Sequence, residues 1–434
     1  MRKLNKIHDL YIGEDEDFFI KDIIPEHYVD QNIDNNSLDV GCAVRFLQNE
    51  LNAILQSFLN GGFSYLGFMF YPFIKDVSID NLKKIKRLKR IALFLHNNGH
   101  DFSNSIKEFK GKSNNLKFAR ILSALYQDFF QVKHKKLNLA KKNKCKEFDV
   151  NDYKKSDLHY LRPLSGLKVY ANRYLKQYLS GFYLHGSLAS KDYIKGWSDV
   201  DTLSVISNET IENPEALLKL RNKMYYMRYY FYQIDQLQHH GSIVITEYDL
   251  GNYCQAYFPV PVFNYARSFF KDDKISEFSA RDFSHEAFER MFYFVSYFRH
   301  LNLEKKYNLG SHDTKILLHS ITLFPTIYLQ AKGKLLYKKF SFDIAKKDFD
   351  RDMWQVIDDI GSMRLNWKNP GKLPLSHLSS KINPLFYYQL NSRVFDLIKD
   401  MKKTNKIDTQ SLIRSMFNLS EEAWGKIKKN AKVK

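Results

Sequence analysis

The sequence predicts an α+β fold, in which a small mixed β-sheet with flanking helices lies between helical N-terminal and C-terminal regions. Two observations carry this prediction. Short apolar runs at 182–185 and 202–206 lie close together near the middle of the 434 residues and have the length of buried strands. Longer segments before and after them repeat apolar residues at the helical spacing.

The order of these segments divides the chain into three expected regions. We expect residues 1–160 to be mainly helical and basic, and residues 161–262 to form a central domain built on the sheet. Residues 263–434 are expected to form a helical C-terminal domain.

Composition indicates a folded, soluble protein of the cytoplasm. The apolar content is 44% and the aromatic content 15%, which is typical of chains with a packed core. The cysteines lie far apart, at Cys42, Cys145 and Cys254, so neither a disulfide framework nor a zinc site is expected. Residues 1–9 lack the apolar core of a signal peptide, and the apolar stretch 63–74 is too short to span a bilayer. Membrane insertion is therefore not expected, and the oligomeric state is left open.

The formal net charge of +19 favours a polyanionic partner. RNA or DNA is the first expectation and an anionic membrane surface the second. The alternative is a basic surface that is simply solvated, because net charge specifies neither fold nor partner.

The basic residues of the N-terminal region gather around predicted helices. Apolar residues at helical spacing predict one helix at 44–58 and another at 82–95, whose opposite face is rich in lysine and arginine. A further lysine run covers 133–146, close to the aromatic residues Phe129 and Phe130. Such helices either follow a nucleic-acid backbone or present a solvated lysine face, and the sequence does not decide between these alternatives.

The central region alternates helices and strands. A helix is expected at 164–179, before the first strand. Asn213 and Pro214 have the pattern of a helix start, and that helix is expected to end near Tyr230. Further strands are expected at 231–237 and 242–248.

The most informative residues lie at the ends of the first two apolar runs. Alternate residues of a strand point to the same side, so Asp199 and Asp201 direct two carboxylates to one place while Val200 faces away. Adjacent carboxylates repel unless a proton or a cation is present, and Mg²⁺ takes such oxygen ligands together with substrate phosphates. Gly186 allows the backbone to approach a phosphate, and Ser187 adds a hydroxyl. This pattern predicts a site for a nucleoside triphosphate.

At these residues the sequence resembles the polymerase-beta-like nucleotidyltransferase superfamily. The signature of that superfamily is an apolar residue, Gly, then Gly or Ser, followed after about ten residues by two acids that alternate with apolar residues. Leu184 to Ser187 match the first half, and Asp199 to Leu203 match the second. One departure is Thr202, which stands where an apolar residue is commoner.

The resemblance implies a third carboxylate on the next strand, as a further metal ligand or as the base for the acceptor hydroxyl. Asp235 is favoured because it follows the predicted helix directly, Glu247 is the alternative, and Asp249 is a weaker third choice. His239 and His240 lie between the candidates, and they either contact a phosphate or aid proton transfer, or are turn residues before a glycine. A metal site with histidine ligands is not expected, because no cluster of ligands surrounds them in the sequence.

In the C-terminal region, a long helix is expected at 314–331, bent at Pro325. Many members of the superfamily have a helical domain here that closes the nucleotide cleft. By that resemblance Lys315, Lys338 and Lys339 are candidates for contacts with the triphosphate.

Together, these observations predict an enzyme that moves a nucleoside monophosphate from an NTP to an acceptor hydroxyl with Mg²⁺ or Mn²⁺. An RNA or tRNA 3′ end is the first candidate acceptor, and a protein or small-molecule hydroxyl the alternative. A second hypothesis is a nucleic-acid-binding protein that keeps an inactive nucleotidyltransferase-like scaffold. Neither the acceptor nor the NTP is specified by the sequence.

Overall fold

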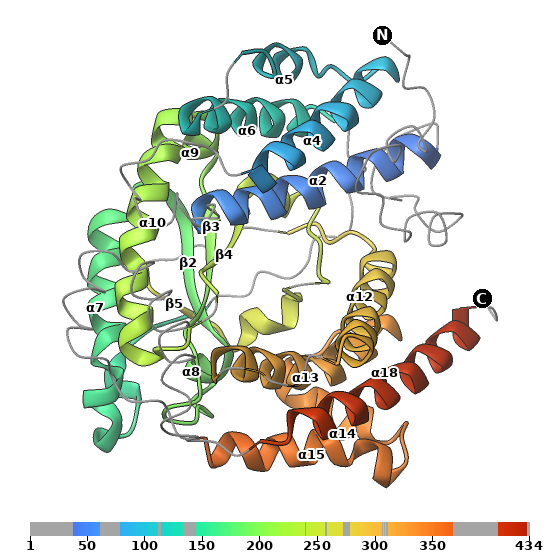
Figure 1. Cartoon of the computed structure of the whole chain (residues 1–434). Coiled ribbons are helices and arrows are strands. Elements are labelled where there is room, and N and C mark those ends of the chain that lie inside the picture. The colour runs from blue at the N-terminus through green and yellow to red at the C-terminus, as the bar shows by residue number, and fades with distance from the viewer. Residues whose placement is uncertain are drawn as a thin grey trace.

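The computed structural model describes residues 38–60, 79–111, 114–132, 145–238, 240–256, 258–271, 278–305, 307, 309, 311–367 and 407–431. Within them the chain is a mixed α+β fold, with helices before and after a single small sheet, as expected (Figure 1). Residues 133–144, which hold most of the lysine run, and His239 lie outside the described residues.

The sheet contains five strands in the order β1-β5-β2-β3-β4. Their bounds are Lys146–Glu147 (β1), Leu179–His185 (β2), Asp201–Ile206 (β3), Ile243–Thr246 (β4) and Arg267–Ser268 (β5). β2 is antiparallel to β3 and β5, whereas β3 is parallel to β4 and β1 to β5, so the sheet is mixed. The sheet includes two short strands, β1 and β5, that lie outside residues 161–262, the region expected from the sequence to form the central domain.

Alternate side chains of the central strands enter different cores. Phe182 and Leu184 pack in a core with the helices, whereas Tyr183, Leu203 and Val205 pack against the segment that follows β4. Both faces of the strands are therefore buried, which explains why these runs are almost continuously apolar.

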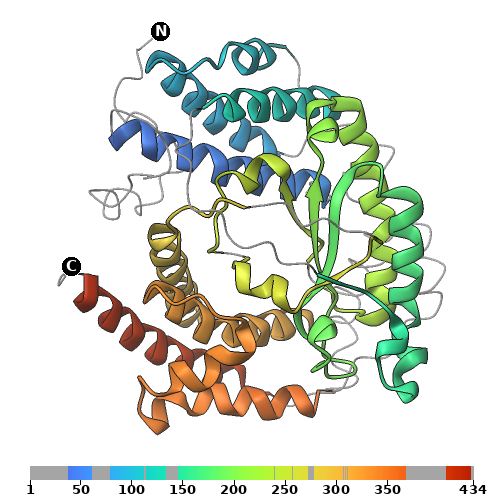
Figure 2. The ribbon, with the colours of Figure 1, turned by 180° about the vertical axis from the view of Figure 1, so that it is seen from behind.

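Two helices cover one face of the sheet, α7 (Leu158–Tyr174) and α10 (Pro214–Ile234) (Figures 1 and 2). The strand expected at 231–237 is wrong, because α10 continues to Ile234. Phe231 and Ile234 extend the helical spacing of Met224 and Met227, and all of these side chains are buried. Burial of one helix face therefore outweighs the β-propensity of this aromatic segment.

The N-terminal helices share one core with the sheet. They are α2 (Leu38–Leu59), α4 (Ile79–Asn97), α5 (Ser103–Glu108) and α6 (Asn115–Phe130). Helix α2 lies along the edge strand β4, where Gln56 accepts a hydrogen bond from Val244 N at 2.7 Å and donates one to Ser242 O at 2.5 Å. The Gln56 amide thus satisfies backbone groups that an open sheet edge leaves unpaired.

The C-terminal helices surround a separate core. They are α12 (Ser284–Leu303), α13 (Ser311–Ala331), α14 (Lys338–Lys346), α15 (Arg351–Leu365) and α18 (Thr409–Ala431). The helix expected at 314–331 is confirmed as α13, which contains Pro325. In Figure 1 this group of helices lies beside α8, at the end of β2.

The remaining elements are short. They are the α-helices α8 (Gly186–Ser190), α9 (Asn208–Glu212) and α11 (Glu247–Leu250), and the 3₁₀ helices at Val150–Asp152, Lys155–Asp157 and Val260–Asn264. Among the helices of the described chain, none has the length and apolar character needed to cross a membrane.

Candidate active site

Three strand ends meet at one edge of the sheet. β2 ends at His185, which is paired with Asp201 at the start of the antiparallel strand β3. β4 runs parallel to β3, so the residues before Ile243 lie at this same edge. The glycine-serine turn, the aspartate pair and the segment before β4 are therefore brought together by the topology of the sheet.

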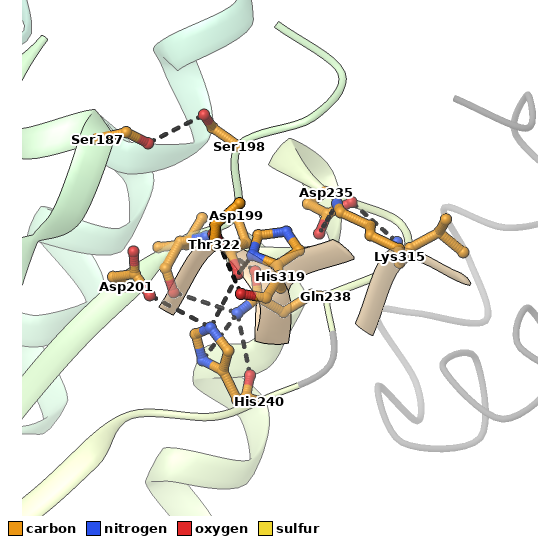
Figure 3. A network of polar contacts seen from close by, with 12 residues as sticks. Ser187, Ser198, Asp199, Asp201, Asp235, Gln238, His240, Lys315, His319 and Thr322 are labelled. Atoms are coloured by element: carbon orange, nitrogen blue, oxygen red, sulfur yellow. Dashed lines mark hydrogen bonds and ion pairs between the residues drawn. The ribbon is translucent and has the colours of Figure 1, made fainter. Parts of the chain in front are cut away.

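Asp199, Asp201 and His240 form a compact group at this edge (Figure 3). His240 Nε2 lies 2.9 Å from Asp199 Oδ2 and 3.3 Å from Asp201 Oδ1. One ligand atom from each residue lies within 4.8 Å of the others, a separation that suits a shared metal ion. The aspartates converge as the sequence predicted, although β3 begins only at Asp201. The third member of the group is a histidine, for which no metal site was expected.

The electrostatics of the group explain its geometry. Burial alone lowers the pKa of His240, but hydrogen bonds to Asp199 and Asp201 and their charges outweigh it and raise this pKa well above its ordinary value. A positive imidazolium between the carboxylates offsets their mutual repulsion, and a divalent cation has the same effect.

Gln238 holds the aspartate pair in position. Its side-chain oxygen accepts a hydrogen bond from Val200 N at 2.9 Å, and its Nε2 donates to Val200 O at 3.2 Å. The same Nε2 is 3.0 Å from His240 O. The Gln238 amide thus binds the backbone between the two acids and also that of His240, so it fixes all three donors relative to one another.

The backbone of Gly186 passes directly beside Asp201. Its φ angle is +68°, and a Cβ on Gly186 would lie only 2.1 Å from Asp201 Oδ2. The neighbouring Ser187 donates a hydrogen bond to Ser198 Oγ at 2.9 Å. Tyr337 from the C-terminal region donates to Gly186 O at 3.1 Å, which ties the turn to that region.

Asp235 does not join the group, although it was the favoured third carboxylate. It is the C-cap of α10 and pairs with Lys315 of α13 at 2.7 Å, and both side chains are almost fully buried. Burial raises the pKa of Asp235, while the charge of Lys315 opposes this shift. Because its carboxylate is bound to Lys315, Asp235 is poorly placed to ligate a metal or to accept a proton.

The other two candidates have structural partners elsewhere. Because β4 is parallel to β3, Glu247 follows the end of the strand that lies opposite to the aspartate pair. There Glu247 accepts a hydrogen bond from Asn208 N at 2.8 Å. Asp249 caps the start of α11 and accepts a hydrogen bond from Gln48.

The candidate phosphate-binding lysines differ in their surroundings. Lys338 is partly buried and donates a hydrogen bond to Thr322 Oγ1 at 2.8 Å. Burial and then the charge of Arg364 lower the pKa of Lys338 to about 8, against the opposing charges of Asp201 and Asp199. Lys339 is exposed and lies 3.5 Å from a carboxylate oxygen of Asp192.

Besides Gln238, two residues that the sequence did not single out interact with the pair from the C-terminal helices. His319 of α13 stacks on Trp197, with ring centroids 4.7 Å apart, and its Nδ1 is 4.0 Å from Asp199 Oδ2. The Arg364 guanidinium lies 5.6 Å from the Trp197 ring centroid, and its Nε is buried without a hydrogen-bond partner in the described chain. No local pattern marks either residue, because each reaches the site from a distant helix.

Comparison of the chain with protein-family models, with curated proteins and with solved structures gives no significant match. A functional conclusion therefore depends on the side chains of the site and on their chemistry.

Proposed function

We propose that the protein is a metal-dependent nucleotidyltransferase, which transfers a nucleoside monophosphate from an NTP to an acceptor hydroxyl and releases pyrophosphate. One observation carries the proposal. The carboxylates of Asp199 and Asp201 lie at the sheet edge where the glycine-serine turn begins, and Asp201 Oδ2 is close enough to Gly186 to exclude any side chain there. A cation and a phosphate chain are the ligands that this combination suits.

The donor set fits a divalent cation such as Mg²⁺ or Mn²⁺. Asp199 and Asp201 supply carboxylate oxygens and His240 supplies an imidazole nitrogen, all within 4.8 Å of one another. When bound, the ion would offset the negative charge that develops on the transferred phosphate and on the pyrophosphate leaving group.

Two cations that interact electrostatically with this group are suited to the phosphates. The charges of Asp199 and Asp201 act on Lys338, and that of Asp199 acts on Arg364. Lys338 Nζ donates a hydrogen bond to the neutral Thr322 hydroxyl, and Arg364 Nε is buried without a hydrogen-bond partner in the described chain. Phosphate oxygens would satisfy both of them, whereas the partner of Lys315 is already Asp235. We therefore assign the phosphate contacts to Lys338 and Arg364, with the backbone of Gly186 and the hydroxyl of Ser187.

In the reaction, the acceptor oxygen forms a bond to the α-phosphorus while the bond from that phosphorus to pyrophosphate breaks. The proton of the acceptor hydroxyl has to leave, and the buried Asp235 is ion-paired. We assign the role of proton acceptor to the carboxylates of Asp199 and Asp201 at the proposed site.

An RNA or tRNA 3′ end is the proposed acceptor. The formal net charge of +19 favours a polyanionic acceptor over a cationic small molecule. Incubation with total RNA, total protein or small-molecule pools together with labelled NTPs separates the classes, and label in RNA is the expected result.

The decisive experiment compares wild type with Asp199→Asn/Asp201→Asn in an assay with each labelled NTP and Mg²⁺ or Mn²⁺. We expect transfer by the wild type and a loss of at least about 100-fold in the variant, because the carboxylates that would hold the charge-stabilising cation are removed. Asp358→Asn is the control, since Asp358 is exposed on α15 and, among the described residues, pairs with Lys346 alone. Equal transfer by wild type and the double variant contradicts the proposal.

A further inference from the structure

The third donor of the proposed metal site is an imidazole and not a carboxylate. The register between β3 and β4 determines the identity of the third donor, because it places His240 next to the aspartate pair. Neither Asp235 nor Glu247 lies there. Within the described chain, the only group of three possible metal ligands is Asp199, Asp201 and His240.

The second nitrogen of His240 also has the partner that a metal-bound histidine needs. Nδ1 lies 3.0 Å from the carbonyl oxygen of Gly241. A proton on Nδ1 donated to this carbonyl leaves the lone pair of Nε2 free to bind an ion, and Nε2 is the atom that faces Asp199 and Asp201. Nε2 contacts two carboxylate oxygens, so an ion bound there would take the place of the Nε2 proton, and the ring is held in the orientation of a ligand.

An imidazole nitrogen changes which ion the site prefers. Mg²⁺ favours oxygen ligands in strict octahedral geometry, whereas first-row transition metals accept mixed nitrogen and oxygen donors. We infer that the site formed by Asp199, Asp201 and His240 selects a transition-metal ion such as Mn²⁺ over Mg²⁺, and that His240 Nε2 is the ligand that sets this preference. The inference rests on the proposed function only in taking this group as a metal site.

A titration of the full-length protein with Mn²⁺ alone, followed by electron paramagnetic resonance and repeated with Mg²⁺ as competitor, measures the preference. The quantity of interest is the ratio of Mn²⁺ to Mg²⁺ affinity. His240→Asp should lower this ratio at least about ten-fold, because even loss of a group that only supports a metal ligand lowers metal affinity about ten-fold or more. An unchanged ratio overturns the inference.

The matched control is His319→Asn. His319 Nδ1 is 4.0 Å from Asp199 Oδ2, so it is a second histidine whose nitrogen approaches the pair, but its ring stacks on Trp197. This variant should keep the ratio of the wild type. A drop in the ratio for His319→Asn with none for His240→Asp identifies the wrong histidine and overturns the assignment.

A second measurement needs no variant. Pulsed electron paramagnetic resonance of Mn²⁺ bound to the wild type should show a directly coordinated ¹⁴N nucleus, and its absence rejects imidazole ligation. The two proposals fail separately. Binding of Mn²⁺ without nitrogen coupling rejects the inference and leaves nucleotidyl transfer in place. Nitrogen coupling in a protein that transfers no nucleotide supports the inference and contradicts the proposed function.

Discussion

Gly186 and Asp201 are so close that any side chain on the glycine would collide with the carboxylate. The distance from an ideal Cβ on Gly186 to Asp201 Oδ2 is 2.1 Å, and the φ angle of Gly186 is +68°. The backbone of the turn after β2 thus lies directly against the start of β3. Asp201, a proposed metal ligand, can occupy its position only because Gly186 has no side chain.

Gly186→Ala should therefore weaken metal binding beyond its effect on stability. The left-handed conformation costs about 1–3 kcal/mol of unfolding free energy for a residue other than glycine. Displacement of Asp201 should in addition lower Mn²⁺ affinity at least about ten-fold. Urea unfolding and a Mn²⁺ titration measure the two effects.

Gly333→Ala is the control for this comparison. Gly333 has a φ angle of +77°, and nothing lies within 4 Å of its added Cβ. It should share the loss of stability and keep the Mn²⁺ affinity of the wild type. Equal Mn²⁺ affinities for the two variants would show that the contact with Asp201 has no influence on the metal.

The buried pair Asp235–Lys315 should act on stability and not on the metal. The side chains are 1% and 0% exposed, so Asp235→Asn leaves a buried charge on Lys315 without its counter-charge. Loss of one partner of such a pair costs about 3–5 kcal/mol. We expect a large fall in unfolding free energy by urea denaturation, with Mn²⁺ affinity of the remaining folded protein close to that of the wild type.

For comparison, the pair Lys346–Asp358 is about half exposed, with side chains 48% and 47% accessible. Lys346→Ala should change the unfolding free energy by less than about 1 kcal/mol, because water screens the interaction. If Asp235→Asn instead abolishes Mn²⁺ binding at unchanged stability, Asp235 is a metal ligand after all.

Triphosphate binding should weaken as the pH rises above neutrality. The pKa of Lys338 is lowered from 10.5 to about 8, chiefly by burial. A phosphate monoester loses its second proton near about pH 6, so the ligand stays fully charged while the lysine loses its charge. A charge-assisted hydrogen bond contributes about 1.5–3 kcal/mol, so affinity for a non-hydrolysable NTP should fall about ten-fold between about pH 7 and 9.

Stability should change in the opposite direction over the alkaline range. Between pH 8 and 10.5 the unfolded chain binds more protons at Lys338 than the folded chain, so this group makes folding more favourable as the pH rises. A fall in affinity is therefore not a sign of unfolding. Lys338→Arg should flatten the pH profile because arginine stays charged, and an unaltered profile in that variant removes Lys338 as its source.

Gln238→Leu should loosen the aspartate pair. The Gln238 amide binds both backbone groups of Val200, and the substitution leaves them buried without these partners. We expect a loss of about 1–3 kcal/mol in unfolding free energy for each orphaned group and a weaker Mn²⁺ site. Gln355→Leu on the exposed face of α15 is the control and should change neither measurement, since within the described part of the chain Gln355 bonds only to the neighbouring Asp359.

Local patterns were sufficient for the central strands and several helices. Neighbouring residues alone show the apolar runs of β2 and β3 and the helical spacing of α13, and these elements were predicted correctly. The strands β1 and β5 escaped prediction because each is only two residues long and exists through pairing with distant partners. The end of α10 was misplaced because burial of Phe231 and Ile234 depends on what packs against that helix.

The same division applies to the candidate site. The sequence determined Gly186, Ser187, Asp199 and Asp201, because a turn and an alternating pair of acids are features of neighbouring residues. Only the tertiary structure decided that His240 lies beside the two aspartates and that Asp235 forms an ion pair with Lys315. The register of parallel strands and the packing of a distant helix fix those two contacts, and neither is encoded in the spacing of residues along one segment.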